Sequence, residues 1–164
     1  MAMSERVVLQ ATQSFLAMQT EAPYSSRGLE LCSTALWHLK DRTMLATLAK
    51  HLSKIDPGSP EACIASGNYS SLNGNHARAL ELFVKAGRLD PTNATALTLA
   101  GHEEAAQGHV EEATRLYREA LTRNPRQYNA WFGLVSVWQH RLLCFEGRGW
   151  EAKRRGGAVG AMCS

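Results

Sequence analysis

Apolar residues recur at helical spacing through the first half of the chain. Leu45, Leu48, Ala49 and Leu52 fall on one face of a helix when 3.6 residues make a turn. A second apolar stretch of the same spacing precedes them at residues 33–39, and a polar break at residues 40–42 separates the two. The pattern predicts a pair of short amphipathic helices rather than strands.

The next stretch carries clearer start and stop signals. Ser59 is a good N-cap, and Pro60 fits the first turn of a helix, where the backbone N–H groups have no intrahelical partner. Asn73-Gly74-Asn75 tolerates the left-handed backbone of a tight turn. Pro91 ends the following segment, because proline disfavours helix in the residue before it. These signals predict helices over residues 60–72 and 76–88.

The pattern then repeats with a period of 34 residues. Glycine stands at 67 and 101, alanine at 79 and 113, an aromatic ring at 83 and 117, and proline at 57, 91 and 125. A helix-turn-helix unit of this length is typical of tetratricopeptide repeats, which stack into solenoids that bind other proteins. The expected fold is an all-α right-handed superhelix of about three and a half helix pairs.

The repeat divides the chain into six segments. We expect an N-terminal helix and linker at 1–25, a degenerate repeat at 26–58, full repeats at 59–92 and 93–126, a partial repeat at 127–141 and a disordered basic tail at 142–164. The partial repeat keeps its first helix, but Val135 replaces the in-phase glycine and Gly147 stands where the in-phase alanine is due. No second helix is predicted there.

The in-phase positions also predict the core and its weak point. The expected core residues are Leu36, Trp37, Leu48, Gly67, Ala79, Leu80, Phe83, Ala86, Gly101, Ala113, Tyr117, Ala120, Trp131 and Leu134. Trp131 and Trp138 should be more exposed than their positions demand, because the helix that would cover them is missing, unless residues 142–145 fold back. An uncapped end of this kind favours self-association.

The distribution of charge and the length of the apolar runs argue against nucleic-acid binding by the repeats and against a transmembrane helix. Residues 141–164 hold the whole net charge of +3, so residues 1–140 are balanced and carry no overall field that attracts nucleic acid. The remaining alternative is a protein that binds nucleic acid through its basic tail. No apolar run is long enough for a transmembrane helix, and we recognise no signal peptide.

Candidate chemistry is sparse. The four cysteines show no metal-ligand spacing, and Cys32 and Cys63 are predicted to be buried free thiols, which favours a reducing compartment. His102-Glu103-Glu104 could suggest a metal or acid–base cluster, but neighbouring helical residues point in different directions, so we interpret it as a solvated helix face. The sequence predicts no enzyme activity, no cofactor and no metal.

Several motifs lie outside the general repeat pattern. Ser33-Thr34-Ala35-Leu36-Trp37-His38-Leu39 and Tyr128-Asn129-Ala130-Trp131-Phe132-Gly133-Leu134 resemble, in order and spacing, the cell division cycle protein 27 homologues. The resemblance runs from Pro23 to Arg141. It departs at Cys32, where the family usually has tyrosine, and at Val135, where it usually has glycine.

This resemblance implies a function. The family provides non-catalytic scaffold subunits of the anaphase-promoting complex, a ubiquitin ligase of the cell cycle found in nucleus and cytoplasm. Its partners would be other subunits of that complex and the Ile-Arg C-terminal tails of activators, with no small molecule, nucleic acid or membrane. The alternative is a general repeat adaptor or co-chaperone that binds peptide tails.

The binding residues are expected on the first helix of each pair, which lines the concave surface in this repeat. Asn68 offers an amide that can donate and accept, Phe132 offers an apolar contact for isoleucine, and Glu61 offers a partner for arginine. The predicted peptide-binding residues are Glu61, Ile64, Asn68, Thr98, His102, Asn129 and Phe132.

Overall fold

The computed structural model describes residues 10, 13, 17 and 29–139. Residues 10, 13 and 17 are helical; the rest of the predicted N-terminal helix and linker, the disordered tail and the fold-back of residues 142–145 lie outside the described residues. Across residues 29–139 the secondary structure is helical and contains no strand. The helices are α2 (Leu29–His38), α3 (Arg42–Ile55), α4 (Pro60–Leu72), α5 (His76–Leu89), α6 (Ala94–Ala106) and α7 (Val110–Arg123), followed by a helical segment at 128–139.

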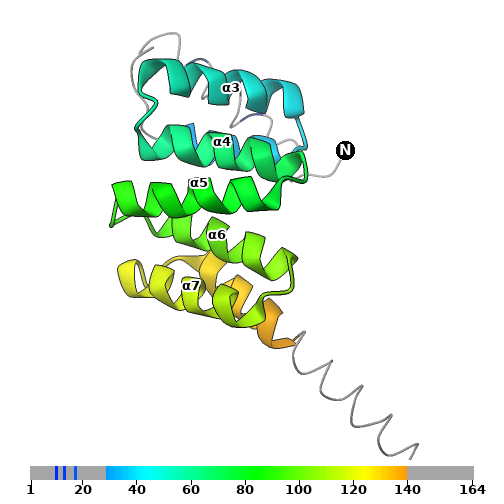
Figure 1. The fold of residues 1–164 in the computed structure, drawn as a ribbon, viewed down its shortest axis with the longest axis vertical. Helices are drawn as coiled ribbons and strands as arrows, with labels where there is room; N and C mark the ends of the chain where they lie inside the picture. Colours follow the sequence, from blue (N-terminus) through cyan, green and yellow to red (C-terminus); the bar gives the residue numbers. More distant parts are fainter. Residues whose placement is uncertain (1–9, 11–12, 14–16, 18–28, 140–164) are drawn as a thin grey trace, which may run out of the picture.

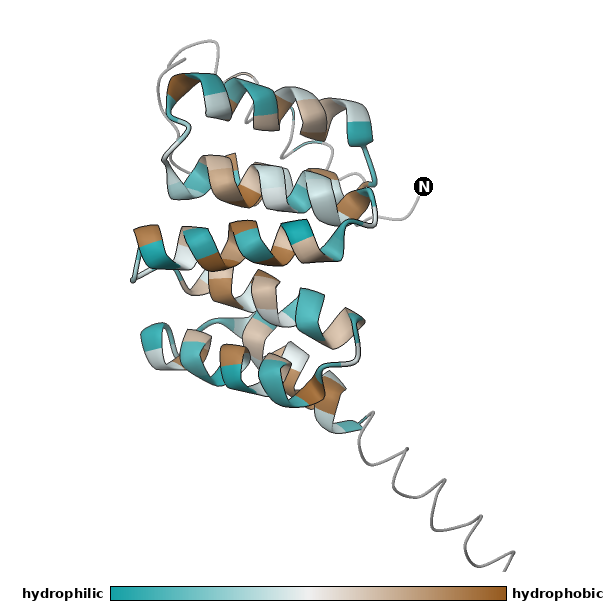
Figure 2. Cartoon of the chain, viewed as in Figure 1, coloured by the Kyte–Doolittle hydropathy of each residue, from teal (hydrophilic) through white to brown (hydrophobic). Residues whose placement is uncertain are grey.

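The helices form antiparallel pairs that stack in one direction (Figure 1). α4 packs against α5 and α6 against α7, while contacts between α5 and α6 and between α3 and α4 join successive pairs. The helix predicted over residues 60–72 is confirmed by α4, and the helix predicted over 76–88 is confirmed by α5, which ends one residue later. Figure 2 shows apolar and polar residues mixed along α3, α5 and α7, as expected for amphipathic helices, whereas α4 and α6 have buried residues on several sides.

Caps and glycine turns fix the length of each unit. The side chains of Ser59, Asn75 and Asn93 accept a hydrogen bond from the backbone N–H three residues later, at the start of α4, α5 and α6. Gly74 and Gly108 have φ angles of +79° and +83°, a conformation that favours glycine, and each lies between the two helices of a pair. The turns therefore recur in phase with the helices.

Glycines also mark where the helices approach most closely. A Cβ atom on Gly67 would lie 2.5 Å from Cε1 of Phe83, and one on Gly101 would lie 2.6 Å from Cε1 of Tyr117. Gly133 makes the same approach from the next unit, because a Cβ there would also lie 2.6 Å from Cε1 of Tyr117. The ring of Tyr117, 1% exposed, is thus enclosed by glycines from two successive first helices.

Most of the predicted core is buried, with one clear correction. Trp131 is 52% exposed, and Trp37, Leu80 and Leu134 are only partly buried. The reason for Trp131 is that no described helix covers its outer face, and its indole Nε1 donates to the carbonyl oxygen of Pro125 at 3.0 Å. Trp138 is 56% exposed, so the expectation that both tryptophans would be more exposed than their positions demand is confirmed.

Two further sequence expectations concern thiols and membranes. Cys32 and Cys63 are buried free thiols, as predicted. Burial raises the pKa of the Cys32 thiol, which favours its neutral form. Among the described residues, no helix combines the length and apolar character that crossing a bilayer requires.

Candidate peptide-binding groove

A groove with a volume of about 410 Å³ crosses the first helices of successive pairs. We call it the first-helix groove. Its lining comes from α2, α4, α6 and the segment 127–132: Thr34, Trp37, His38, Asn68, Thr95, Thr98, Leu99, His102, Glu103, Gln127, Asn129 and Phe132. Five of the seven predicted peptide-binding residues are brought together here: Asn68, Thr98, His102, Asn129 and Phe132.

Asn68 and Thr98 lie deep in the groove and already have partners. Asn68 is 2% exposed, and its Nδ2 donates to Oγ of Ser33 at 2.9 Å and to Oγ1 of Thr34 at 3.4 Å. The hydroxyl of Thr98 donates to the carbonyl oxygen of Ala94 at 2.8 Å. The amide group of Asn68 therefore joins α4 to α2, so this residue has a structural role as well as a place in the groove.

His102 presents a neutral imidazole to the groove. Burial, the largest effect, lowers its pKa; Glu103 opposes the change, and His38 adds to it. Nδ1 of the ring lies 2.8 Å from the hydroxyl oxygen of Tyr117, and burial raises the pKa of that phenol. When the phenol donates to Nδ1, the proton of the neutral imidazole lies on Nε2, which is then able to donate to a ligand.

The edge of the groove toward the end of the described chain is apolar and exposed. Phe132 is 71% exposed, and Asn129 beside it is also exposed. A large apolar surface next to a hydrogen-bonding amide suits a peptide with apolar side chains, because the amide can form hydrogen bonds with the N–H and C=O groups of the peptide backbone.

Two of the predicted residues do not line the groove. Ile64 is fully buried in the central core cluster, and Glu61 is partly exposed outside the lining. The physical reason for Ile64 is that α2, α3 and α5 all pack against α4, so an apolar side chain one turn before Asn68 is enclosed. The placement of Ile64 on the binding surface is therefore wrong for this structure.

The interpretation of residues 102–104 as a solvated face is also wrong. Glu103 is 6% exposed: its Oε1 accepts from the hydroxyl of Ser71 at 2.6 Å, and its Oε2 lies 2.7 Å from Nδ1 of His76. Ser71 in turn accepts from the indole Nε1 of Trp37 at 3.2 Å. The carboxylate thus connects α2, α4 and α5 with α6, and the histidine that begins α5 is the signal that could have revealed it.

Glu104 also contacts a histidine at the start of a helix, here at the turn between α6 and α7. Its Oε2 lies 2.7 Å from Nδ1 of His109, which occupies the N-cap position of α7. No group of three metal-ligating side chains occurs within the part of the chain that the structure describes. The carboxylates are partners of imidazoles, and this arrangement stabilises the turns between helices.

Comparisons with known proteins agree with this geometry. Residues 94–137 match the model of a tetratricopeptide repeat family. Protein bimA of Emericella nidulans is 40% identical over 129 residues, covering 79% of this chain and 16% of bimA. Anaphase-promoting complex subunit 3 of Schizosaccharomyces pombe is 38% identical over 124 residues, covering 76% of this chain and 19% of that protein.

Two more comparisons point the same way. The cell division cycle protein 27 homolog of Caenorhabditis elegans is 40% identical over 110 residues, which are 67% of this chain and 14% of the homolog. The crystal structure of the APC/C hetero-tetramer Cut9–Hcn1 matches with a TM-score of 0.67 at 18% identity, over 80% of this chain and 28% of that one. The fold is the all-α solenoid of tetratricopeptide repeats. The chain spans less than a fifth of the length of these curated relatives.

Proposed function

We propose that this chain, whose sequence resembles the cell division cycle protein 27 homologues, is a non-catalytic, protein-binding scaffold segment of an anaphase-promoting complex. The observation that carries the proposal is the first-helix groove, which gathers an amide, a neutral imidazole and an exposed phenylalanine across three successive units. Cell-cycle ubiquitin-dependent proteolysis is the process it would serve, in nucleus and cytoplasm. Other subunits of the same complex are its proposed partners.

Within that function, the groove would take the C-terminal Ile-Arg tail of an activator. Phe132 offers a surface for the isoleucine, and Nε2 of His102 can donate to the terminal carboxylate. Glu61 lies outside the groove, so we assign the arginine contact to Glu103, the carboxylate among the lining residues. Its oxygens hold further lone pairs beyond the bonds with Ser71 and His76.

Phe132 provides the cleanest test, because its exposure lets it be changed without disturbing the core. We expect Phe132→Ala to weaken binding of a fluorescein-labelled peptide ending in Ile-Arg by about fivefold, close to 1 kcal/mol, through loss of apolar contact. Fluorescence anisotropy with the full chain measures this. The matched control is Tyr128→Ala, because Tyr128 is 82% exposed and does not line the groove.

The same titration tests which other residues contact the peptide. Equal affinity for the Phe132 and Tyr128 variants would show that the tail binds elsewhere. An affinity change below about 0.5 kcal/mol for Asn68→Ala, less than a typical buried hydrogen bond contributes, would remove Asn68 from the contact surface. Co-purification separates the alternative function, a general adaptor or co-chaperone, since that chain would retain chaperone tails rather than subunits of the complex.

Self-association through the uncapped end stays a prediction. The exposed face at that end comprises Leu134, Val135 and Trp138 of the segment 128–139 together with Arg118 and Leu121 of α7. Its apolar character is what the sequence led us to expect.

A further inference from the structure

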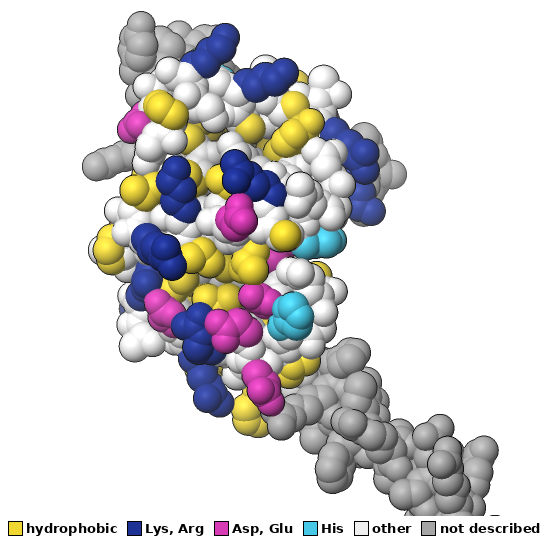
Figure 3. All heavy atoms as spheres, in the orientation of Figure 1, with side chains coloured by type: hydrophobic (Ala, Val, Ile, Leu, Met, Phe, Trp, Pro, Cys, Tyr) yellow, Lys and Arg dark blue, Asp and Glu magenta, His cyan; other side chains and the backbone are white. Residues whose placement is uncertain are grey.

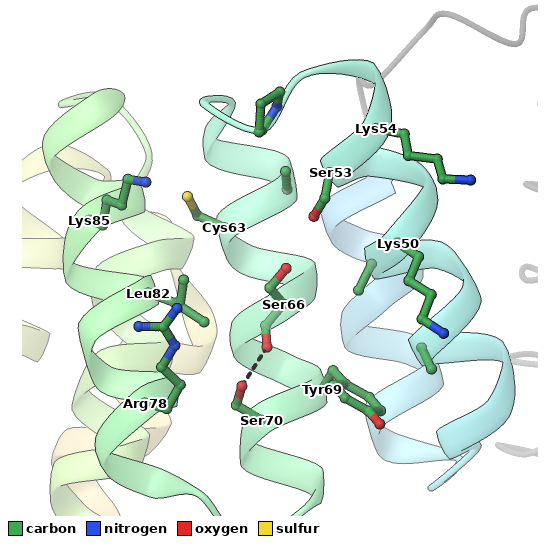
Figure 4. Close-up of a pocket in the computed structure, with 14 residues that line it drawn as sticks. Lys50, Ser53, Lys54, Cys63, Ser66, Tyr69, Ser70, Arg78, Leu82 and Lys85 are labelled. Atoms are coloured by element: carbon green, nitrogen blue, oxygen red, sulfur yellow. Dashed lines mark hydrogen bonds between the residues drawn. The ribbon is translucent and has the colours of Figure 1, made fainter.

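A second groove lies on the opposite side of α4 from the first-helix groove, between α3 and α5 (Figure 4). Its volume is about 580 Å³. Ser66 and Ser70 of α4 lie on its floor, whereas Asn68 lines the first-helix groove. Residues two apart on a helix point about 200° away from each other, so the two grooves use different faces of one helix.

The rim of this second groove is positively charged. Lys50 and Lys54 come from α3, and Arg78 and Lys85 come from α5, with no carboxylate among the lining residues. Figure 4 shows the two lysines of α3 on one side and the two basic residues of α5 on the other. In Figure 3, Lys and Arg side chains flank apolar atoms on this face. We call this the basic groove.

The lysines are available to a ligand. Lys50, Lys54 and Lys85 form no salt bridge with any described residue, and Arg78 pairs only with Glu81, at 3.2 Å between two well-exposed side chains. Such an exposed pair contributes little and is readily exchanged. Burial chiefly raises the pKa of the Cys63 thiol on the floor, Lys85 lowers it and Asp56 raises it.

The spacing of the charges indicates the shape of the ligand. Lys50 and Lys54 are one turn apart, about 6 Å along the helix, and Arg78 and Lys85 are two turns apart, about 10 Å. The cations therefore follow the length of the groove instead of converging on one point. An extended chain of negative charges matches this arrangement better than a single small anion does.

The floor distinguishes a peptide from a nucleic acid. Tyr69 is the one aromatic ring among the lining residues, and the floor is otherwise made of two serines and of small or apolar side chains: Ala46, Ala49, Ala62, Cys63, Ser66, Ser70 and Leu82. Single-stranded nucleic acids usually need a series of aromatic rings on which successive bases stack. A floor of this kind instead fits the aliphatic side chain of a peptide.

We propose that the basic groove binds an acidic peptide segment of a protein partner, held in an extended form with its carboxylates on the lysine and arginine rim and an aliphatic side chain over the floor. This surface is separate from the first-helix groove. A scaffold built in this way holds two protein ligands on opposite faces of α4.

The test uses the full chain and a labelled peptide of four Glu-Asp-Leu repeats. Anisotropy at low salt should show binding of this peptide and not of the matched Gln-Asn-Leu peptide. The double variant Lys50→Glu/Lys85→Glu should weaken binding by about tenfold or more, since it turns two attractive charges into repulsive ones. The control Arg88→Glu/Arg126→Glu makes the same change in net charge outside the groove and should alter affinity by less than about twofold.

Several outcomes would overturn the proposal. An equal loss in both double variants would mean that only net charge matters, and loss through Phe132→Ala alone would place the peptide in the first-helix groove. Tighter binding of oligo-dT or phosphatidylserine vesicles, abolished by the Lys50/Lys85 change, would identify a nucleic acid or a membrane as the occupant instead. Circular dichroism melting of every variant separates a loss of binding from a loss of fold.

Discussion

Gly101→Leu should destabilise the chain by about 2 kcal/mol, a large effect for a single substitution. A Cβ atom at this position would already lie 2.6 Å from Cε1 of Tyr117. The ring cannot retreat, because Gly133 approaches it from the next unit. Overpacking of this kind costs about 1–3 kcal/mol or more, and the better helix propensity of leucine, worth about 1 kcal/mol, offsets part of it. Urea unfolding measures the difference.

The control for this substitution is Gly58→Leu. A Cβ at Gly58 meets only Oδ1 of Asp56, at an ordinary 3.4 Å, so the same change should cost much less there. A double-mutant cycle with Tyr117→Ala tests the cause directly, because removal of the ring should relieve most of the cost of placing leucine at position 101. If the two costs simply add, the close approach of Gly101 to Tyr117 is not what limits this position.

Glu103→Ala should be comparably damaging, at about 2–3 kcal/mol. The carboxylate is buried and accepts from Ser71 and His76, and hydrogen bonds to charged groups contribute about 1.5–3 kcal/mol. Its removal leaves the hydroxyl of Ser71 without an acceptor inside the structure, which adds a desolvation cost. Chemical unfolding followed by far-ultraviolet circular dichroism measures the loss.

Glu112→Ala is the matched control. Glu112 bonds to Arg115 at 2.6 Å on an exposed surface of α7, and an exposed pair of this kind contributes within about 0.5 kcal/mol. Glu103→Gln should fall between the two, since the amide oxygen still accepts from Ser71 while the charge facing His76 is lost. Equal stability of the Glu103→Ala and Glu112→Ala variants would show that the buried carboxylate adds nothing.

The helices were predictable because their signals are local. Ser59, Pro60 and the Asn73-Gly74-Asn75 turn specify the start and end of α4 by backbone chemistry within a few residues. The 34-residue period then identified Gly101 and Tyr117 as the in-phase counterparts of Gly67 and Phe83, whereas the close approach of each glycine to a ring appears only in the structure. Each of these inferences compares a residue with its neighbours or with its own repeat.

The missed features depend on contacts between units. Ser71 and Glu103 are 32 residues apart, and nothing in either local sequence indicates that they meet. The burial of Ile64 follows from three helices closing around α4, which no single amphipathic pattern reveals. The basic groove was also invisible, because the balanced charge of the whole segment hides how lysines of α3 and α5 are distributed in space.

The Tyr117 side chain ties the first-helix groove to the segment 128–139. Its ring is enclosed between Gly101 of α6 and Gly133 of the segment 128–139, while its hydroxyl is bonded to His102 in the first-helix groove. Any shift of the segment 128–139 must push on this ring, because no free volume separates them. The Tyr117 side chain therefore links the position of the segment 128–139 to that of the His102 imidazole.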